Sequence, residues 1–191
     1  MNKFAKKFKI LSVLLFFDGG KNFMSKVMED LAAAFAGESQ ANRKYTAFAE
    51  QAEKDNLPGV AKMFRAIASA ETLHAISHFK TMGGVKTTAE NLKAALDGET
   101  HEFTTMYPDF IKDAEAEGNA KAKASFNMAN EAEKAHGALY KKTLENLDSL
   151  KGKDIDWYVC PICGYVHEGS APEQCPICKV PGSKFLKNPE K

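Results

Sequence analysis

Glu71-Thr72-Leu73-His74 is a Glu-x-x-His motif, and the chain repeats it further on as Glu133-Lys134-Ala135-His136. An upstream glutamate in a Gly-Glu-Ser/Thr context accompanies each copy: Glu38 the first and Glu99 the second. Two chemically matched halves predict an internal duplication with a site between the halves. One Glu-x-x-His motif alone would be weak evidence, because Glu and His are common on helix surfaces. Two copies, each matched to an upstream glutamate at a nearly equal offset, are strong evidence.

The residues around these motifs have the periodicity of helices. Apolar positions recur at three- and four-residue steps over 25–55, 60–82, 87–117 and 119–150, and turn residues separate the four segments. Thr87-x-x-Glu90 forms a capping box, and Pro108 is expected to bend or break the third helix. Short connections, with a longer one between the second and third helices, predict a bundle of two helical hairpins.

The motif side chains fall on the apolar stripes of these helices rather than on their polar faces. Glu102 shares the face of Glu99 because the two are three positions apart. Unpaired buried carboxylates are costly, so this burial requires cations. One Glu from each of two helices plus Glu-x-x-His from the other two is the arrangement of carboxylate-bridged di-iron and di-manganese proteins. The predicted metal ligands are Glu38, Glu71, His74, Glu99, Glu102, Glu133 and His136.

A solvated charged face with surface ion pairs is the alternative interpretation of these residues. It does not explain why the charges follow the apolar stripe. His78 and His101 have no counterpart in the other half, so we expect them at the surface or beside a ligand.

All four cysteines belong to two Cys-Pro-Ile-Cys knuckles, made by Cys160, Cys163, Cys175 and Cys178. None is left for a disulfide elsewhere, which favours a reducing compartment and a metal site. About 35 residues cannot form a stable core alone, so a metal must supply folding energy. Four thiolates suit zinc or iron, and a zinc ribbon is the plainest interpretation of the spacing. Nearby aromatics, the turn at Gly164 and the redox-capable metal pair favour iron.

Composition and the first residues exclude some classes of function. Lys and Arg total 26 against 25 Asp and Glu, so the charge balance does not indicate a nucleic-acid partner. The apolar run 10–17 after several lysines resembles a signal peptide, but it is short and no small-residue cleavage site follows. We expect translation to begin at Met24, with 1–23 as an upstream extension, since 18–23 can be encoded by a ribosome-binding site. The run is also too short to span a membrane.

Five stretches resemble the rubrerythrin family over about residues 25–188: AGESQANRKY (36–45), AETLH (70–74), GETHEFTTMYP (98–108), AEKAH (132–136) and CPICGYVHEGSAPEQCPIC (160–178). The resemblance implies a mainly α chain. A ferritin-like four-helix diiron bundle would occupy 24–150, a linker 151–154, and a rubredoxin-like Fe(Cys)4 domain 155–191. Two features depart from the family pattern. Residues 1–23 have no counterpart, and Lys179 stands where simple rubredoxins often have Gly, which is expected to shift the potential of the cysteine site or to alter a turn.

The resemblance also implies three iron ions per chain and a role for each ligand of the diiron pair. Glu71 and Glu133 would bridge the irons. Glu38 and His74 would serve one iron, and Glu99 and His136 the other.

Three further residues are implied as catalytic. Glu102 is the extra carboxylate of the family and would replace His74 on one iron after oxidation. Tyr45 and Tyr107 match family tyrosines near the diiron pocket, where they would donate hydrogen bonds to ligands or peroxide.

The activity implied is that of a cytoplasmic, homodimeric peroxidase in oxidative-stress defence. Hydrogen peroxide would be reduced to water with electrons from NAD(P)H, delivered through a separate reductase or a rubredoxin to the cysteine-bound iron. One subunit's rubredoxin-like domain would lie near the other subunit's diiron site. The alternatives are a ferritin-like ferroxidase or iron-storage protein, and a structural protein with zinc in both sites.

Overall fold

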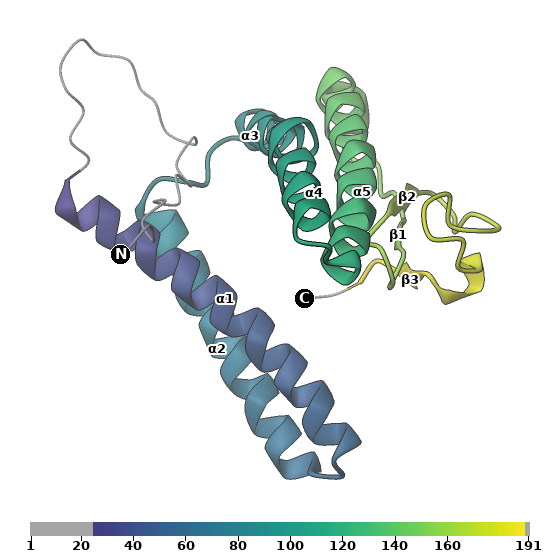
Figure 1. Cartoon of the computed structure of the whole chain (residues 1–191). Coiled ribbons are helices and arrows are strands. Elements are labelled where there is room, and N and C mark those ends of the chain that lie inside the picture. Colours follow the sequence, from purple (N-terminus) through teal and green to yellow (C-terminus); the bar gives the residue numbers. More distant parts are fainter. Residues whose placement is uncertain (1–24, 190–191) are drawn as a thin grey trace. The chain divides into compact units, whose positions relative to one another are not determined.

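The structure is a computed structural model that describes residues 25–189. The chain forms two compact units that meet in the sequence between Lys86 and Thr87 (Figure 1). Each unit is described by itself below. The proposed extension over 1–23 lies outside the described residues.

The first unit is a hairpin of two long helices, α1 (Lys26–Lys54) and α2 (Pro58–Thr81). The side chain of Ser25 caps α1 by accepting a hydrogen bond from the amide of Met28 at 3.3 Å. Helix α2 begins two residues earlier than the predicted start at Val60. Pro58 explains the difference, because proline needs no amide partner in the first turn of a helix.

Small side chains form the contact between α1 and α2. The fully buried residues are largely alanines, and on α2 they recur at every seventh position as Ala61, Ala68 and Ala75. Asn42 is buried beside them and donates hydrogen bonds to the carbonyl of Ala68 and the hydroxyl of Thr72, each at 2.7 Å. The helices therefore pack closely along a seam of alanines, with one satisfied polar group in it.

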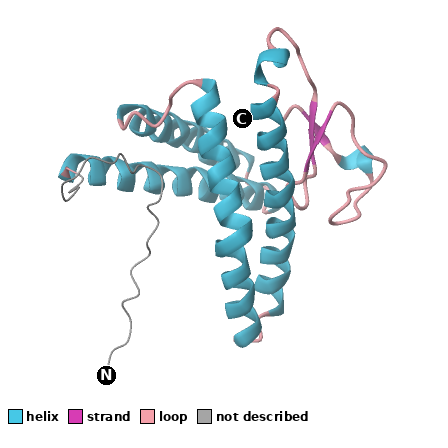
Figure 2. Cartoon of the chain, turned by 90° about the horizontal axis from the view of Figure 1, so that it is seen from above, coloured by secondary structure: helices cyan, strands magenta, loops and turns pink. Residues whose placement is uncertain are grey.

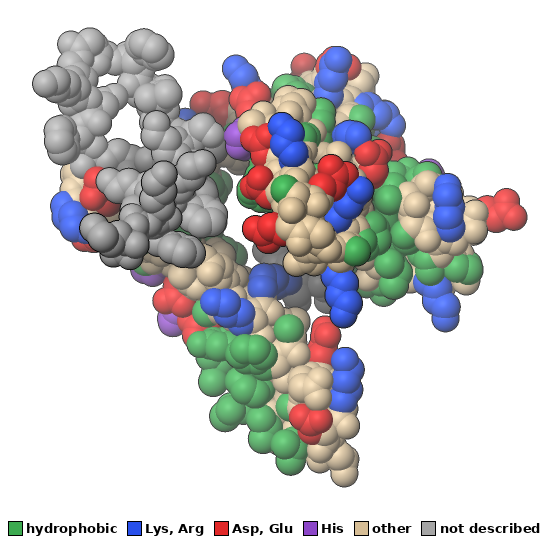
Figure 3. Space-filling view, in the orientation of Figure 1, with side chains coloured by type: hydrophobic (Ala, Val, Ile, Leu, Met, Phe, Trp, Pro, Cys, Tyr) green, Lys and Arg blue, Asp and Glu red, His purple; other side chains and the backbone are tan. Residues whose placement is uncertain are grey.

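The large apolar side chains of the hairpin lie on another face. Phe48, Met63 and Ile67 are 48%, 51% and 39% exposed, and Figure 3 shows hydrophobic side chains gathered over the lower part of α1 and α2. The apolar stripe predicted from the sequence is thus not the face that the hairpin buries within itself. A helix must bury such a stripe against another element, which fits a hairpin that belongs to a larger bundle.

The second unit begins with α3 (Thr88–His101), the π-helix η1 (Glu102–Met106) and α4 (Tyr107–Ala116) in one continuous run. The capping box at Thr87 and Glu90 is confirmed. Helix α5 (Ala120–Glu145) follows Gly118, and a short 3-10 turn, η2 (Leu147–Leu150), completes the predicted fourth helix. Regular α-helix therefore ends at Glu145 rather than at Leu150.

The predicted break at Pro108 takes the form of the π-helix. The amide of Tyr107 donates to the carbonyl of Glu102, five positions earlier. In the sequence, the separation between Glu38 and Glu99 is one position shorter than the separation between Tyr45 and Tyr107. A π-turn accommodates one extra residue within an α-helix. The second half therefore carries a single inserted residue, and η1 absorbs it.

Matching aromatic clusters support the duplication. In the first unit the ring centroid of Tyr45 lies 6.2 Å from those of both Phe48 and Phe64, which are 5.6 Å apart. The second unit repeats this triad as Tyr107, Phe110 and Phe126, with centroid separations of 6.2, 6.3 and 5.6 Å. All three pairs of equivalents have the same separation in the sequence. The two halves thus share side-chain packing as well as motifs.

The rest of the second unit is a small domain with a three-stranded antiparallel sheet, which Figure 2 shows among loops. Its strands are β1 (Trp157–Val159), β2 (Val166–Glu168) and β3 (Leu186–Lys187), in the order β2-β1-β3, with a short 3-10 turn, η3 (Gly182–Lys184), before β3. Met128 of α5 packs against the cysteine cluster of this domain, and Lys142 of α5 forms an ion pair with Glu168. The domain therefore contacts α5 directly.

The expected fold class is confirmed: over residues 25–189 the chain is mainly α, with four helical segments (α1, α2, the continuous run α3–η1–α4, and α5) and a small C-terminal knuckle domain. Among residues 25–189, no helix combines the length and the apolar character that a membrane span requires.

Candidate metal centres

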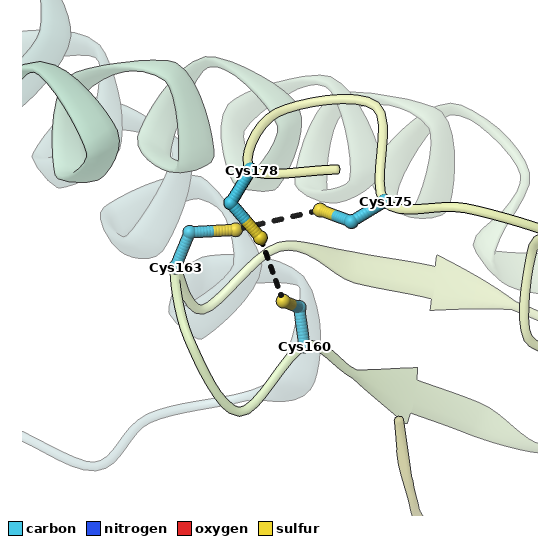
Figure 4. A group of neighbouring side chains, drawn as sticks. All are labelled: Cys160, Cys163, Cys175 and Cys178. Atoms are coloured by element: carbon cyan, nitrogen blue, oxygen red, sulfur yellow. Dashed lines mark hydrogen bonds between the residues drawn. The ribbon is translucent and has the colours of Figure 1, made fainter. Parts of the chain in front are cut away.

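The four cysteines converge at the tips of two loops, with their sulfur atoms pointing toward one another (Figure 4). All four Sγ atoms lie within 4.8 Å of one another. The closest pairs are Cys160 with Cys178 at 3.4 Å and Cys163 with Cys175 at 3.5 Å. A disulfide would require about 2.05 Å, whereas tetrahedral sulfurs at about 2.3 Å from a metal would be about 3.8 Å apart. The geometry fits one tetrahedral metal ion.

The backbone of each loop also favours thiolates. Burial by itself raises the pKa of Cys175, but the amides of Cys178 and Ile177 donate to its sulfur, and its pKa falls to about 7. Burial raises the pKa of Cys163 to about 12, despite an amide hydrogen bond from Tyr165. Amide hydrogen bonds thus lower the pKa of a thiol in both loops and oppose the effect of burial. Hydrogen bonds of this kind tune iron–sulfur sites.

The second unit brings Glu99, Glu133 and His136 together, with one ligand atom from each inside a 4.8 Å group. Nδ1 of His136 lies 2.6 Å from a carboxylate oxygen of Glu133 and 3.8 Å from one of Glu99. All three side chains are largely buried, at 21%, 16% and 19% exposed for His136, Glu133 and Glu99. Three of the predicted ligands therefore converge within this unit.

The electrostatics of this group indicate a cation site. Burial, followed by the neighbouring carboxylate of Glu133, raises the pKa of Glu99 to about 7. The oxygen Oε2 of Glu99 is buried and has no hydrogen-bond partner. A buried, unsatisfied carboxylate oxygen beside a second carboxylate is costly unless a metal ion binds it. The donor set of two carboxylates and one imidazole suits iron.

The first unit brings Glu38, Glu71 and His74 together in the same way. Nδ1 of His74 lies 3.0 Å from a carboxylate oxygen of Glu71, the same pairing that His136 makes with Glu133. His74 is 58% exposed within its unit, so this group is more open than its counterpart. Each hairpin thus carries one half-site of identical composition.

Glu102 is placed near the second half-site but is not among its three convergent ligands. Burial, followed by the charge of Glu133, raises its pKa. The same two causes, in the same order, raise the pKa of the Tyr107 hydroxyl. Both side chains therefore lie in the field of the carboxylate group.

Tyr140 is a neighbour of this half-site for which the motifs predicted no role. Burial raises its pKa, followed by the charges of Glu99 and Glu133. The sequence does indicate that Tyr140 lies near the half-site, because it follows His136 by four residues and so shares its helical face. Of the two unmatched histidines, His101 is exposed and His78 is partly buried, and neither joins a group of converging ligands among the described residues.

A hydrogen bond connects the second half-site with the cysteine cage. Nε2 of His136 lies 3.0 Å from the carbonyl oxygen of Gly164, the residue that follows Cys163. A carbonyl can only accept, so Nε2 carries the proton and leaves the Nδ1 lone pair for a metal. Metal-binding histidines commonly donate their other N–H in this way.

Comparisons with known proteins agree with this arrangement. The family described as Rubrerythrin matches residues 29–144, and the family described as Rubrerythrin, rubredoxin-like domain matches residues 158–186. Nigerythrin of Nitratidesulfovibrio vulgaris is 35% identical over 86% of this chain and 88% of its own length. Rubrerythrin-2 of Clostridium acetobutylicum is 34% identical over 81% and 92%, and rubrerythrin of Porphyromonas gingivalis 35% identical over 84% and 89%.

Solved structures of relatives agree as well. The structure of fully reduced, all-ferrous nigerythrin is 34% identical and covers 88% of this chain and 90% of its own, with a TM-score of 0.52. Family matches cover both the helical region and the knuckle region, and the relatives extend over most of the chain. The chain therefore belongs to the rubrerythrin family.

Proposed function

We propose that this protein is a peroxidase that reduces hydrogen peroxide to water, with electrons that reach a diiron pair through the iron of the cysteine site. The observation that carries the proposal is the hydrogen bond from His136 to Gly164, because it connects a ligand of one metal site with the peptide next to a ligand of the other. A storage protein has no need of such a connection. The chemistry balances as hydrogen peroxide, two protons and two electrons giving two waters.

In this proposal a diiron pair would take its ligands from both half-sites. By the family resemblance, Glu71 and Glu133 would bridge the two irons; each of them lies beside its motif histidine. Glu38 and His74 complete one iron's ligands, and Glu99 and His136 the other's. Ferrous iron held by these residues would supply the two electrons, and iron held by the four cysteines would return them one at a time.

The protein's own side chains bind and orient the peroxide. The raised pKa of Tyr107 keeps its hydroxyl protonated, so it can donate a hydrogen bond to an oxygen of the substrate. Tyr45 holds the equivalent place in the first aromatic triad and is assigned the same role. Glu102 supplies the extra carboxylate that the oxidised pair requires.

Electrons from NAD(P)H reach the cysteine site through a separate reductase or a rubredoxin. Within one chain, the path from Cys163 runs through the Gly164 peptide and across one hydrogen bond to His136. This route lies within one chain, whereas the family resemblance implies transfer between the two subunits of a homodimer. We retain the homodimer as part of the proposal. Four cysteines in a metal arrangement suit the reducing cytoplasm, where we place the protein.

Anaerobic stopped-flow spectroscopy of the fully reduced protein tests this function. We expect one equivalent of hydrogen peroxide to oxidise the diiron pair, with the visible band of the ferric cysteine site appearing afterwards as that site supplies electrons. Dioxygen under the same conditions should react more slowly. Faster reaction with dioxygen, together with oxidation of many added ferrous ions per chain, would instead establish the ferroxidase alternative.

A further inference from the structure

The two cysteine loops have the same backbone hydrogen bonds at equivalent positions of their Cys-Pro-Ile-Cys motifs. In the first, the amide of Gly164 donates to the carbonyl of Cys160 at 3.0 Å. In the second, the amide of Lys179 donates to the carbonyl of Cys175 at 3.1 Å. The residue after the second cysteine therefore closes each loop in the same way.

That closing position requires a left-handed backbone. Gly164 has φ of 79°, and Lys179 has φ of 65°. Glycine adopts this conformation readily, whereas a side chain with a Cβ is strained there. The first loop uses glycine and the second carries a lysine in spite of the strain. The side chain of Lys179 must therefore contribute something that glycine would lack.

The Lys179 side chain folds back over its own loop. Its ammonium donates a hydrogen bond to the carbonyl oxygen of Pro176 at 2.7 Å, between the two cysteines of that loop. The Gln174 side chain donates to the Lys179 carbonyl at 2.8 Å and fixes the backbone from the other side. A positive charge is thus held at the carbonyl of Pro176, within the second loop between Cys175 and Cys178. At the equivalent position the first loop has Gly164, which carries no charge.

We propose that Lys179 is a potential-tuning residue, which favours the reduced state of the iron held by the four cysteines. Four thiolates with ferric iron carry one net negative charge, and reduction adds a second. A fixed ammonium nearby stabilises the more negative state and raises the reduction potential. This proposal rests on the iron assignment of the proposed function, but not on peroxidase activity.

Three substitutions separate charge from backbone strain. Lys179→Met removes the charge and keeps the strained Cβ. Lys179→Gly removes both, and Lys179→Arg keeps the charge. Lys184→Met serves as the matched control, because Lys184 is another exposed lysine of the same domain and its loss changes the net charge equally.

The readout is the reduction potential of the full-length, iron-reconstituted protein, followed by the visible band of the ferric cysteine site in a mediated titration. At a fixed applied potential, Lys179→Met and Lys179→Gly should lower the ratio of reduced to oxidised sites about threefold to tenfold, where tenfold corresponds to about 59 mV for one electron. Lys179→Arg and Lys184→Met should remain within about twofold of the wild type. High salt should shrink the effect, since Lys179 is exposed.

An unchanged ratio in Lys179→Met, or an equal shift in Lys184→Met, would overturn the proposal. A shift in Lys179→Gly without one in Lys179→Met would assign the effect to the backbone instead of the charge, which also overturns it. Failure of the proposed function appears differently: the reconstituted protein would show no ferric cysteine band, or would show it and not react with peroxide. None of the potential measurements uses peroxide or a reductase.

Discussion

The imidazole of His136 stands between two metal sites, with Nε2 at 3.0 Å from the carbonyl of Gly164 and Nδ1 at 2.6 Å from Glu133. The cysteine domain thereby fixes the orientation and tautomer of a ligand that belongs to the helical half-site. Because that domain depends on its own metal for folding, the two metal sites are expected to be coupled in stability as well as in electron transfer.

Unfolding the cysteine domain should therefore weaken the helical metal site. Cys160 and Cys175 are 1% and 0% exposed, so replacing both with Ser removes the cage. His136 then loses the acceptor for its Nε2 proton, and cobalt(II) affinity of the helical site should fall about tenfold to a hundredfold. Competition with a chelator measures this affinity.

Wild-type protein with zinc in the cysteine site, which keeps the domain folded, should retain full affinity. Unaltered affinity in the double variant, with the loss of the domain verified by NMR, would refute the coupling.

Zinc in the cysteine site also tests the electron path without a mutation. Zinc keeps tetrahedral thiolate coordination but has no redox chemistry. Protein with zinc there and iron in the helical site should consume one equivalent of peroxide and then stop in the presence of NAD(P)H and the reductase. Oxygen-free assays of peroxide consumption measure this. Sustained turnover at the rate of the all-iron protein would show that electrons bypass the cysteine domain.

Local features of this fold were predictable from the sequence, because each depends on residues close together in the chain. The capping box at Thr87 satisfies a helix amide within three positions, and it appears as predicted. The Cys-Pro-Ile-Cys spacing similarly defines each loop of the cage. The contact between Glu133 and His136 follows from their spacing of three positions on one helix.

Features that depend on distant packing were not predictable. The contact between His136 and Gly164 joins two segments far apart in the chain, and no local pattern indicates it. The alanine seam in the first hairpin carries a weaker hydrophobic signal than the large side chains beside it, so the periodicity indicated the face that carries Glu38, Glu71 and His74 but not the face on which α1 and α2 contact each other. The slight change of offset between the two halves was visible in the sequence, but Pro108 suggested a kink where the helix instead widens into η1.

The raised pKa of Glu99 predicts how metal binding depends on pH. A carboxylic acid with a pKa of about 7 is mostly protonated at about pH 6, and its proton must leave before a metal binds. Apparent affinity for cobalt(II) should therefore rise with pH up to about 7 and change less above it. Calorimetry in buffers of different ionisation enthalpy should detect more protons released at about pH 6 than at about pH 8, and Glu99 should account for nearly one of them.

Two variants on the helices assign that proton. Glu99→Gln should reduce the difference in proton release between the two pH values by nearly one proton, and should lose one metal ion. Glu131→Gln, at an exposed carboxylate that pairs with Lys134 on α5, should behave as wild type. If the difference were the same in Glu99→Gln as in wild type, the titrating group would be a different one.

Glu102 breaks the symmetry of the duplicated site, since the residue three positions after Glu38 is Ala41. In the proposed diiron site, Glu38, Glu71, Glu99 and Glu133 would carry four negative charges, which would balance two ferrous ions. Oxidation to two ferric ions would leave two positive charges there, where charge imbalance is costly. A fifth carboxylate reduces that excess, and Glu102 lies close enough to Glu133 for their charges to interact.

Replacing Glu102 should therefore affect the oxidised pair more than the reduced one. Glu102→Gln keeps the size of the side chain and removes its charge. Because Glu102 lies outside the three converging ligands, ferrous iron should bind within about threefold of its affinity for the wild type. This corresponds to a loss of less than about 1 kcal/mol in binding free energy. The potential of the diiron pair should rise, and its reaction with peroxide should slow at least about tenfold, which corresponds to about 1.4 kcal/mol in the barrier. Redox titration and stopped-flow spectroscopy measure the two effects.

Glu99→Gln provides the contrast, because it should already fail to hold one ferrous ion. Equal loss of ferrous iron in both variants would make Glu102 an ordinary ligand, and a wild-type peroxide rate in Glu102→Gln would remove it from the mechanism.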